Sequence, residues 1–253
     1  MKKLVNKKIL ITGASQGLGR ALALAFAGED AAAICLTART RKDLDKVALE
    51  IRKINPSTQV LVVAADLSST DDVERIVATT LEAFSGRIDV LVNNASAIGP
   101  TPLPYLLDYP PEDFTRVLKT NLVAPFLMIR SVLSSMIEYG GSIINVTSDA
   151  GVIGYPGWGA YGISKFGLEG MSQTWASELQ DTSVRVNWVD PGSMNTSMHR
   201  AAEPDEDPDQ WADPSSVTDV FVYLASDDSA SVSGKRFQAQ EIWKEIIKKR
   251  HHA

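Results

Sequence analysis

The chain has 253 residues, of which 44% are hydrophobic, and a formal net charge of −6. This length and apolar content are typical of a single α/β domain with a real core, and the acidic charge argues against nucleic acid as a main partner. One cysteine, Cys35, excludes an internal disulfide, and we find neither a signal peptide nor a run of eighteen apolar residues, which predicts a cytoplasmic protein without a membrane partner.

Strand-like and helix-like segments alternate along the chain. The predicted strands are 8–12, 33–37, 60–64, 89–92, 142–146 and 184–189, and the predicted helices are 20–27, 42–54, 71–84, 112–138, 160–179 and 217–224. This alternation predicts an α/β fold with a doubly wound, Rossmann-like parallel sheet, in one domain of residues 1–253 with helices on both faces. Residues 193–214 are irregular, with an acidic, proline-broken stretch from Glu203 to Asp209, and form either a mobile surface loop or a lid over the substrate.

A glycine-rich turn follows the first predicted strand. It reads Gly13-Ala14-Ser15-Gln16-Gly17-Leu18-Gly19 and leads directly into a helix-forming segment. Glycines permit close approach of the backbone, and a helix N-terminus presents free N–H groups to an anion, so this turn is a candidate phosphate site. The spacing differs from the usual Gly-x-Gly-x-x-Gly pattern, and a turn that only packs helix on strand remains the alternative.

Three polar residues in the second half of the chain form a candidate catalytic set. Tyr161 and Lys165 stand four residues apart, about one helical turn, and Ser148 lies thirteen residues before Tyr161. An ammonium about 4 Å away, at an effective dielectric of about 20, favours the phenolate by roughly 4 kcal/mol. We therefore expect Lys165 to lower the pKa of Tyr161 so that the pair exchanges protons near neutral pH. Taken alone, such a pair is more often a solvated surface neighbour.

Taken together, these motifs resemble the short-chain dehydrogenase/reductase family over residues 7–234. The resemblance rests on residues 12–19, Asn93-Asn94-Ala95, Asn121, Ser148, Tyr161, Lys165 and Pro191-Gly192. It implies an oxidoreductase that reduces a carbonyl, or oxidises the secondary alcohol, by hydride transfer with a nicotinamide cofactor. In this family Tyr161 would be the proton donor, Lys165 would hold the nicotinamide ribose, Ser148 would position the substrate oxygen, and Asn121 would be the fourth catalytic member.

The same resemblance implies the cofactor contacts. These are Gly13, Ser15, Gln16, Gly17, Leu18 and Gly19 at the pyrophosphate, Asp66 and Leu67 at the adenine, Asn93 and Ala95 on the adenosine side, Tyr161 and Lys165 at the ribose, and Pro191, Gly192, Met194 and Thr196 at the nicotinamide. Ser96 replaces the glycine that usually follows Asn-Asn-Ala. The second predicted strand ends without an acid, and Arg39 can pair with a 2′-phosphate, so we expect NADP(H) in preference to NAD(H). Gln16 stands where NADP-dependent relatives often carry a cation.

Two alternative functions remain open. One is a cofactor-binding regulatory or scaffold protein of the same fold. The other is an enzyme that acts on ketones carried by an acyl carrier protein, which the acidic stretch 203–209 disfavours because it would repel an acidic carrier. We expect a small-molecule carbonyl or alcohol substrate, no metal, and a homodimer or homotetramer built from the long helices.

Pro125 has no N–H to donate to the carbonyl of Asn121, which leaves that carbonyl free to hold a water for a proton relay.

The C-terminal tail, residues 239–253, is basic and atypical. Gly234 is not followed by the closing Gly-Gly pair with which relatives often end a last strand. Apolar residues at 242, 243, 246 and 247 are compatible with a short amphipathic helix.

Overall fold

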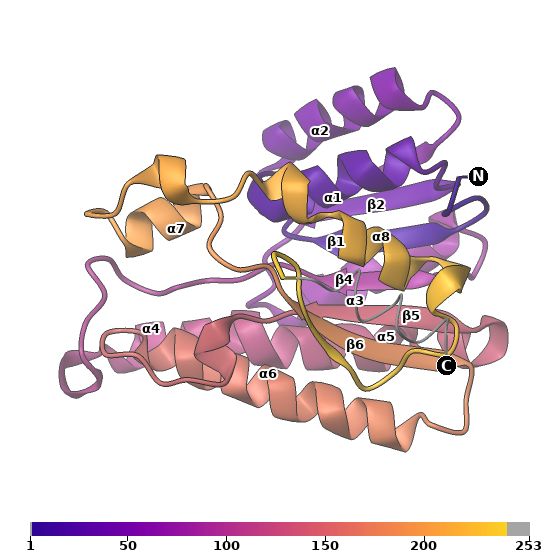
Figure 1. Ribbon diagram of the computed structural model, residues 1–253. Helices are drawn as coiled ribbons and strands as arrows, with labels where there is room; N and C mark the ends of the chain where they lie inside the picture. Colours follow the sequence, from indigo (N-terminus) through magenta and orange to yellow (C-terminus); the bar gives the residue numbers. More distant parts are fainter. Residues whose placement is uncertain (1, 242–253) are drawn as a thin grey trace.

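The structure, a computed structural model, describes residues 2–241, so the expected amphipathic segment of the tail lies outside the described residues (Figure 1). Seven parallel strands form one sheet in the order β3-β2-β1-β4-β5-β6-β7. The strands are β1 (Lys8–Thr12), β2 (Ala33–Ala38), β3 (Gln59–Ala64), β4 (Val90–Asn93), β5 (Gly141–Val146), β6 (Val184–Asp190) and β7 (Arg236–Gln238). The main helices are α1 (Gly17–Gly28), α2 (Arg41–Ile54), α3 (Thr70–Ala83), α4 (Pro111–Leu118), α5 (Ala124–Tyr139), α6 (Gly159–Glu178), α7 (Ser197–Ala202) and α8 (Asp219–Ala225).

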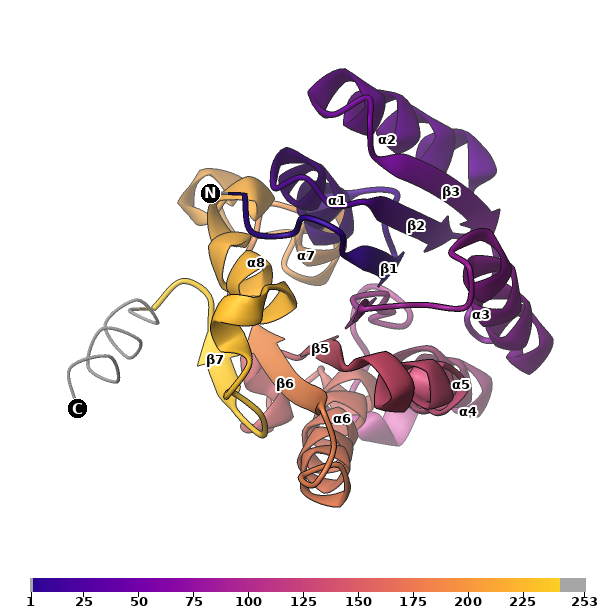
Figure 2. The same ribbon diagram turned by 90° about the vertical axis from the view of Figure 1, so that its right-hand side faces the viewer.

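Helices cover both faces of the sheet, as the alternation of segments predicts (Figure 2). Successive side chains of β1 point to opposite faces: Ile9 and Ile11 pack with α1, α2 and α8, and Leu10 packs with α3 and α5. Cys35 on β2 is fully buried, and its burial raises the pKa of the thiol to about 12. It is therefore an unreactive core residue.

Local sequence features stabilise the ends of α2 and α3. The hydroxyl of Ser69 accepts the N–H of Asp72 and caps α3. In α2, Asp43 lies in the first turn and Arg52 and Lys53 lie in the last, which complements the helix dipole at both ends.

The predicted helix over 112–138 is present but interrupted. A π-helical turn, Lys119–Val123, separates α4 from α5 and contains Asn121. By length and composition the combined helix Pro111–Tyr139 is the one helix among residues 2–241 that could cross a membrane, and 44% of its most apolar window is buried inside the protein. The buried part includes Met128, Ile129 and Val132, which pack in the core with α3.

Strand β7 was not among the predicted elements. It runs parallel to β6, with Trp188, Val189 and Asp190 paired to Arg236, Phe237 and Gln238 in turn. The side chain of Phe237 is buried in the core and holds this strand against the rest of the protein. The edge strand therefore forms without that pair.

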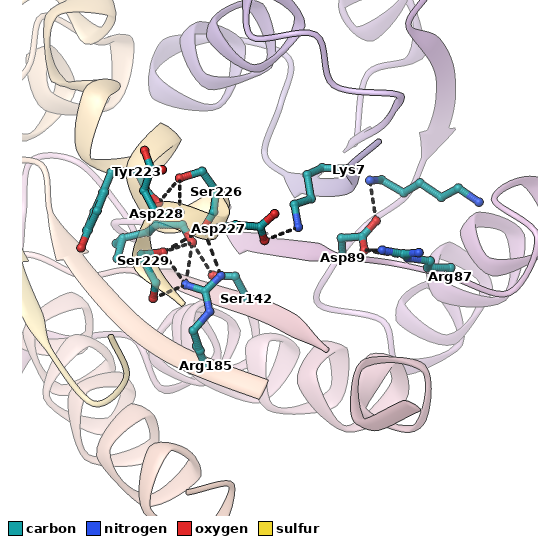
Figure 3. Close-up of polar contacts among 12 residues, drawn as sticks. Lys7, Arg87, Asp89, Ser142, Arg185, Tyr223, Ser226, Asp227, Asp228 and Ser229 are labelled. Atoms are coloured by element: carbon teal, nitrogen blue, oxygen red, sulfur yellow. Dashed lines mark hydrogen bonds and ion pairs between the residues drawn. The ribbon is translucent and has the colours of Figure 1, made fainter. Parts of the chain in front are cut away.

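Polar contacts close the amino-terminal end of the strands, opposite the end where β1 meets the glycine-rich turn (Figure 3). Arg185, near the start of β6, donates to the carbonyl oxygens of Leu224 at 3.2 Å, Ser226 at 3.3 Å and Ser229 at 2.9 Å, and to the hydroxyl of Ser229. The hydroxyl of Ser142 donates to the same Leu224 carbonyl at 2.7 Å. Arg185 thus ties the segment after α8 to the sheet.

We predict that Arg185→Met lowers the free energy of unfolding by about 2–3 kcal/mol, because it removes the charged donor that these three carbonyl oxygens and the Ser229 hydroxyl share. Chemical denaturation measures this loss. The matched control is Arg41→Met, which removes the same charge from an exposed ion pair with Asp45 at 3.2 Å, and whose cost should be below about 1 kcal/mol. Equal losses in the two variants would show that charge alone, and not the carbonyl contacts, sets the effect.

Candidate active site

The carboxyl ends of β1 and β4 are joined by Thr12 and Asn94. The hydroxyl oxygen of Thr12 accepts the N–H groups of Asn94 and Ala95, each at 3.0 Å. The side-chain amide of Asn94 donates to the carbonyls of Thr12 at 2.8 Å and Gly13 at 3.2 Å. The strand order reverses between β1 and β4, which is the position where open α/β sheets bind ligands. The two predicted cofactor segments, 13–19 and 93–95, therefore meet where the strand order reverses.

The glycines of the turn leave no room for side chains. Gly13 and Gly17 have φ values of +67° and +52°. A Cβ atom on Gly13 would lie 2.8 Å from Cα of Ala95, one on Gly17 would lie 3.2 Å from Cγ2 of Thr196, and one on Gly19 would overlap the carbonyl of Gly13. The main chain thus forms a bare cradle at the start of α1, and the Gln16 side chain makes no cap bond there. Free helical N–H groups beside a bare backbone fit a dinucleotide pyrophosphate.

The predicted adenosine residues lie at the ends of β2 and β3. Arg39 is exposed and, among residues 2–241, has no ion-pair partner, whereas Arg41 binds Asp45 at 3.2 Å. Asp66 is exposed and its Oδ1 accepts the N–H of Ser68 at 2.9 Å. A free guanidinium at the end of β2 is therefore available to an anion.

Asn93 is buried, unlike the exposed Arg39 and Asp66. Its side chain is 4% exposed, and its Nδ2 donates to Oδ1 of Asn145 on β5 at 2.8 Å. The side chain therefore joins β4 to β5 inside the sheet. Its Oδ1 has no partner among the described residues. The other predicted contacts differ in exposure: Leu18 and Pro191 are buried, Gly192 is exposed, and the half-buried ones are Ser15, Leu67, Ala95, Met194 and Thr196.

Tyr161, Ser148 and Lys165 are brought together. Tyr161 hydrogen-bonds Ser148, and Nζ of Lys165 lies 5.4 Å from the centre of the Tyr161 ring. Lys165 is 2% exposed and donates to the carbonyl of Val146, at the end of β5, at 2.8 Å. The hydroxyl of Ser148 donates to Oδ1 of Asp149 at 2.8 Å. The helical spacing of 161 and 165 thus points both side chains toward the end of β5.

The pKa of Tyr161 is shifted in the direction opposite to the expected one. Burial raises it to about 12, Asp190 and Asp149 raise it further by their charge, and the hydrogen bond with Ser148 lowers it. Burial also lowers the pKa of Lys165 to about 8, against a small opposing effect of Asp190. Desolvation is therefore the largest cause of both pKa shifts in this structure. At neutral pH Tyr161 is a neutral phenol and Lys165 is mostly protonated.

Asn121 contacts α6 directly and Tyr161 through Ser164. Its Nδ2 donates to the hydroxyl of Ser164 at 2.9 Å and to the carbonyl of Ala97 at 2.8 Å, and its Oδ1 accepts the N–H of Ala97 at 2.7 Å. Ser164 in turn donates to the carbonyl of Tyr161 at 2.6 Å. The π-helical turn places Asn121 where it ties α6 to the loop after β4, an arrangement often found at functional sites. The water relay at its carbonyl stays a prediction.

A cavity of about 520 Å³ opens in front of Tyr161. Its walls come from three segments: residues 147–161, residues 190–206, and the end of the described chain at 238–241. The expected lid folds into α7 and short turns. Trp158 ties it to the start of α6, because its Nε1 donates to Glu203 at 3.2 Å, and within the segment the rings of His199 and Trp211 meet edge-on at 4.4 Å. The first part of this segment, up to Glu206, thus lines the cavity, and its role as a lid stays a prediction.

Sequence reasoning did not find three charged residues at this cavity: Asp149, Asp190 and Arg236. Asp149 and Asp190 line it, and Arg236 lies behind Asp190 at 3.1 Å. The available signals were an acid directly after Ser148, and an acid directly before the Pro191-Gly192 pair. Pairing with Arg236, far along the chain, could not be read from local patterns. No group of His, Cys, Asp and Glu side chains within residues 2–241 has a metal-binding arrangement.

Comparison with known proteins identifies the family. The family model for short chain dehydrogenases matches residues 7–207. The chain is 36% identical to 3-oxoacyl-(acyl-carrier-protein) reductase from Synechocystis sp., over 94% of this chain and 96% of the relative. A solved short chain dehydrogenase from Pseudomonas syringae superposes with a TM-score of 0.89 at 36% identity, over 94% and 96% of the two chains. One from Shigella flexneri 2a, complexed with NADP, gives a TM-score of 0.87 at 30% identity, over 95% and 100%.

Both the sequence match and the superposition extend over nearly the whole chain, including the glycine turn and the Ser148, Tyr161 and Lys165 positions. The protein therefore belongs to the short-chain dehydrogenase/reductase family and is an NAD(P)-dependent oxidoreductase of carbonyl and CH–OH groups.

Proposed function

We propose that the protein is an NADP(H)-dependent reductase in which Tyr161 protonates the oxygen of a carbonyl substrate. The observation that carries this proposal is the position of a neutral phenol, hydrogen-bonded to Ser148, in the wall of a cavity of about 520 Å³. A pKa of about 12 keeps the proton on Tyr161 at neutral pH, which is the form that reduction needs.

Each residue of the site has a role in this proposal. The turn 13–19 would hold the pyrophosphate, and the segment 191–196 the nicotinamide end. Bound NADPH supplies the hydride for the carbonyl carbon. Tyr161 gives its proton to the carbonyl oxygen, and the nearby Lys165 ammonium stabilises the phenolate that remains. Ser148 turns its hydroxyl from Asp149 to the substrate oxygen and orients it.

We predict that Tyr161→Phe lowers kcat/KM for carbonyl reduction by about 10²–10⁴-fold, because the general acid is lost. The loss of NADPH absorbance across a panel of carbonyl compounds measures it, and NADPH fluorescence on binding checks that the cofactor site is intact. Near-normal turnover of this variant would remove Tyr161 from the mechanism. A wild-type protein that binds NADPH but reduces no carbonyl would favour the regulatory or scaffold alternative.

The pKa of Lys165 sets the expected pH dependence. Because this pKa is lowered to about 8, the ammonium that stabilises the phenolate is present below that pH and is lost above it. We predict that kcat/KM for reduction is highest on the acid side of pH 8 and falls as the pH rises through about 8. A rate that increases through this range in the reduction direction would contradict the assigned role of Lys165.

Cofactor preference depends on Arg39 in this proposal, since its guanidinium is exposed and unpaired among the described residues. We predict that Arg39→Ala raises the KM for NADPH about tenfold or more and leaves the KM for NADH nearly unchanged, because only NADPH carries the 2′-phosphate. Arg41→Ala, which removes a cation already bound to Asp45, is the control and should change neither value appreciably. A clear preference of the wild-type enzyme for NADH would refute NADP(H) specificity.

A second candidate function is the reduction of 3-oxoacyl groups on an acyl carrier protein. The name of the Synechocystis relative supports it. Five carboxylates line the cavity and weigh against an acidic carrier: Asp149, Asp190, Glu203, Glu206 and Glu241. We predict a higher kcat/KM for a 3-oxoacyl thioester of a small neutral thiol than for the same acyl group on an acyl carrier protein. The reverse order would establish the carrier-linked substrate.

The expected homo-oligomer and the cytoplasmic location stay predictions.

A further inference from the structure

A buried group of charges lies directly beneath the catalytic pocket. Nε of Arg236, on β7, donates to Glu169 at 2.9 Å, and its Nη2 donates to Asp190 at 3.1 Å. Glu169 and Asp190 are 5% and 4% exposed. The remaining bonds of Glu169 come from the hydroxyl of Thr147 at 2.9 Å and the indole of Trp188 at 2.7 Å. Arg236 is thus the guanidinium that compensates two buried carboxylates.

The same guanidinium connects two segments of the proposed site. Nη2 of Arg236 also donates to the main-chain carbonyl of Ser148 at 3.2 Å. Asp190, its partner, accepts the N–H of Gly192 at 2.9 Å and lines the cavity. The loop after β5, which carries Ser148, and the turn after β6, which carries Gly192, are therefore held against one another through a single ion pair.

Polar side chains of β7 and of the two residues after it lie toward this pocket. Side chains alternate along a strand, so Arg236, Gln238 and Gln240 share one side while Phe237 and Ala239 enter the core. Gln238 lines the cavity. Nε2 of Gln240 donates to the carbonyls of Pro191 at 2.8 Å and Ser193 at 2.9 Å. Contacts with the turn after β6 thus recur along one side of the segment 236–240.

Stability alone does not explain such a cluster. A buried ion pair has a large desolvation cost, and well-packed apolar residues of similar volume are often as stabilising or more so. Three ionisable groups, Lys165, Asp149 and Asp190, act on Tyr161 or lie beside it, and Arg236 lies behind Asp190. Other charged or titratable side chains of the same cavity are Tyr155, His199, Glu203, Glu206 and Glu241.

We propose that Arg236 and Asp190 are positioning residues of the catalytic pocket, and that their ion pair fixes the Ser148 main chain and the Pro191–Ser193 turn in one arrangement around Tyr161. This proposal rests on the proposed reductase function for its kinetic consequences, but not for its effect on Tyr161 itself. The charge of Asp190 raises the pKa values of both Tyr161 and Lys165, so its removal should lower both.

Kinetics test the positioning of Ser148. Arg236→Met should lower kcat for carbonyl reduction by about tenfold or more, with a change in carbonyl KM below about threefold, because a small misplacement of catalytic groups reduces turnover more than binding. Arg236→Lys restores the charge but cannot span Glu169, Asp190 and the Ser148 carbonyl, so most of the loss should remain. Lys235→Met removes the same charge from the adjacent exposed residue and should stay within about twofold of the wild type. A full rescue by lysine would overturn the positioning role.

A second measurement needs no substrate. In protein labelled with ¹³Cζ-tyrosine, the Tyr161 resonance is assigned by its absence in Tyr161→Phe, and its titration is followed by NMR. Asp190→Asn keeps an oxygen for the Gly192 N–H but removes the charge, so the Tyr161 midpoint should fall below about 12 by about half a unit or more. The Lys235→Met midpoint should equal that of the wild type. An unshifted midpoint in Asp190→Asn would overturn the proposal.

The two measurements separate the two hypotheses. If the wild-type enzyme reduces no carbonyl, the reductase function fails, and the Tyr161 titration still decides the role of Asp190. If turnover depends on Tyr161 but neither Arg236→Met nor Asp190→Asn differs from Lys235→Met, the reductase function holds and the positioning role is wrong. If Arg236→Met does not fold, Arg236→Lys and Asp190→Asn give the decision.

Discussion

The burial of Lys165, beside a half-buried Tyr161, is the constraint on which the chemistry of this site depends. Lys165 is 2% exposed, and it donates to the carbonyl of Val146 while its ammonium lies 5.4 Å from the Tyr161 ring. Burial moves the two pKa values toward the neutral forms, to about 8 for the amine and about 12 for the phenol. The phenol therefore holds its proton until a substrate oxygen accepts it. The ammonium beside it then lowers the free energy of the phenolate that forms.

The fold supplies the positions for this arrangement. Strand order reverses beside β1, so the glycine turn and the Asn94 segment lie together at the carboxyl ends of the strands, where open α/β sheets bind ligands. The ends of β5 and β6, on the same side of the sheet, bring Ser148 and the Pro191-Gly192 turn to the neighbouring cavity. Cofactor residues and catalytic residues are far apart in the sequence, and parallel strands gather them at one edge.

Much of this could be predicted from the sequence. Buried strands appear as short apolar runs, and strand, glycine turn and helix in succession predict a phosphate site because only glycine fits where Gly13 lies against Ala95. Spacing of four in a helix places Tyr161 and Lys165 on one face. The family resemblance then adds Asn121, which the structure ties to α6 through Ser164. These features depend on neighbours in sequence or on motifs that recur as a unit.

Other features depend on the folded environment and could not be predicted. The direction of the Tyr161 pKa shift follows from burial, which a spacing rule does not contain. Strand β7 has only three residues and forms because Phe237 fills the core and β6 offers an unpaired edge. The pairing of Arg236 with Asp190 joins residues that are 46 positions apart. In each case the sequence holds the residue types, and tertiary packing decides their role.

Proton transfer from Tyr161 to the substrate oxygen is the central step of the proposed reduction. Single-turnover oxidation of bound NADPH by a carbonyl substrate, compared in light and heavy water at neutral pH, reports that transfer. We expect the wild-type enzyme to react more slowly in heavy water, and the residual reaction of Tyr161→Phe to lose this difference. Equal solvent isotope effects in the wild-type enzyme and in Tyr161→Phe would show that the proton comes from elsewhere, and would contradict the central claim.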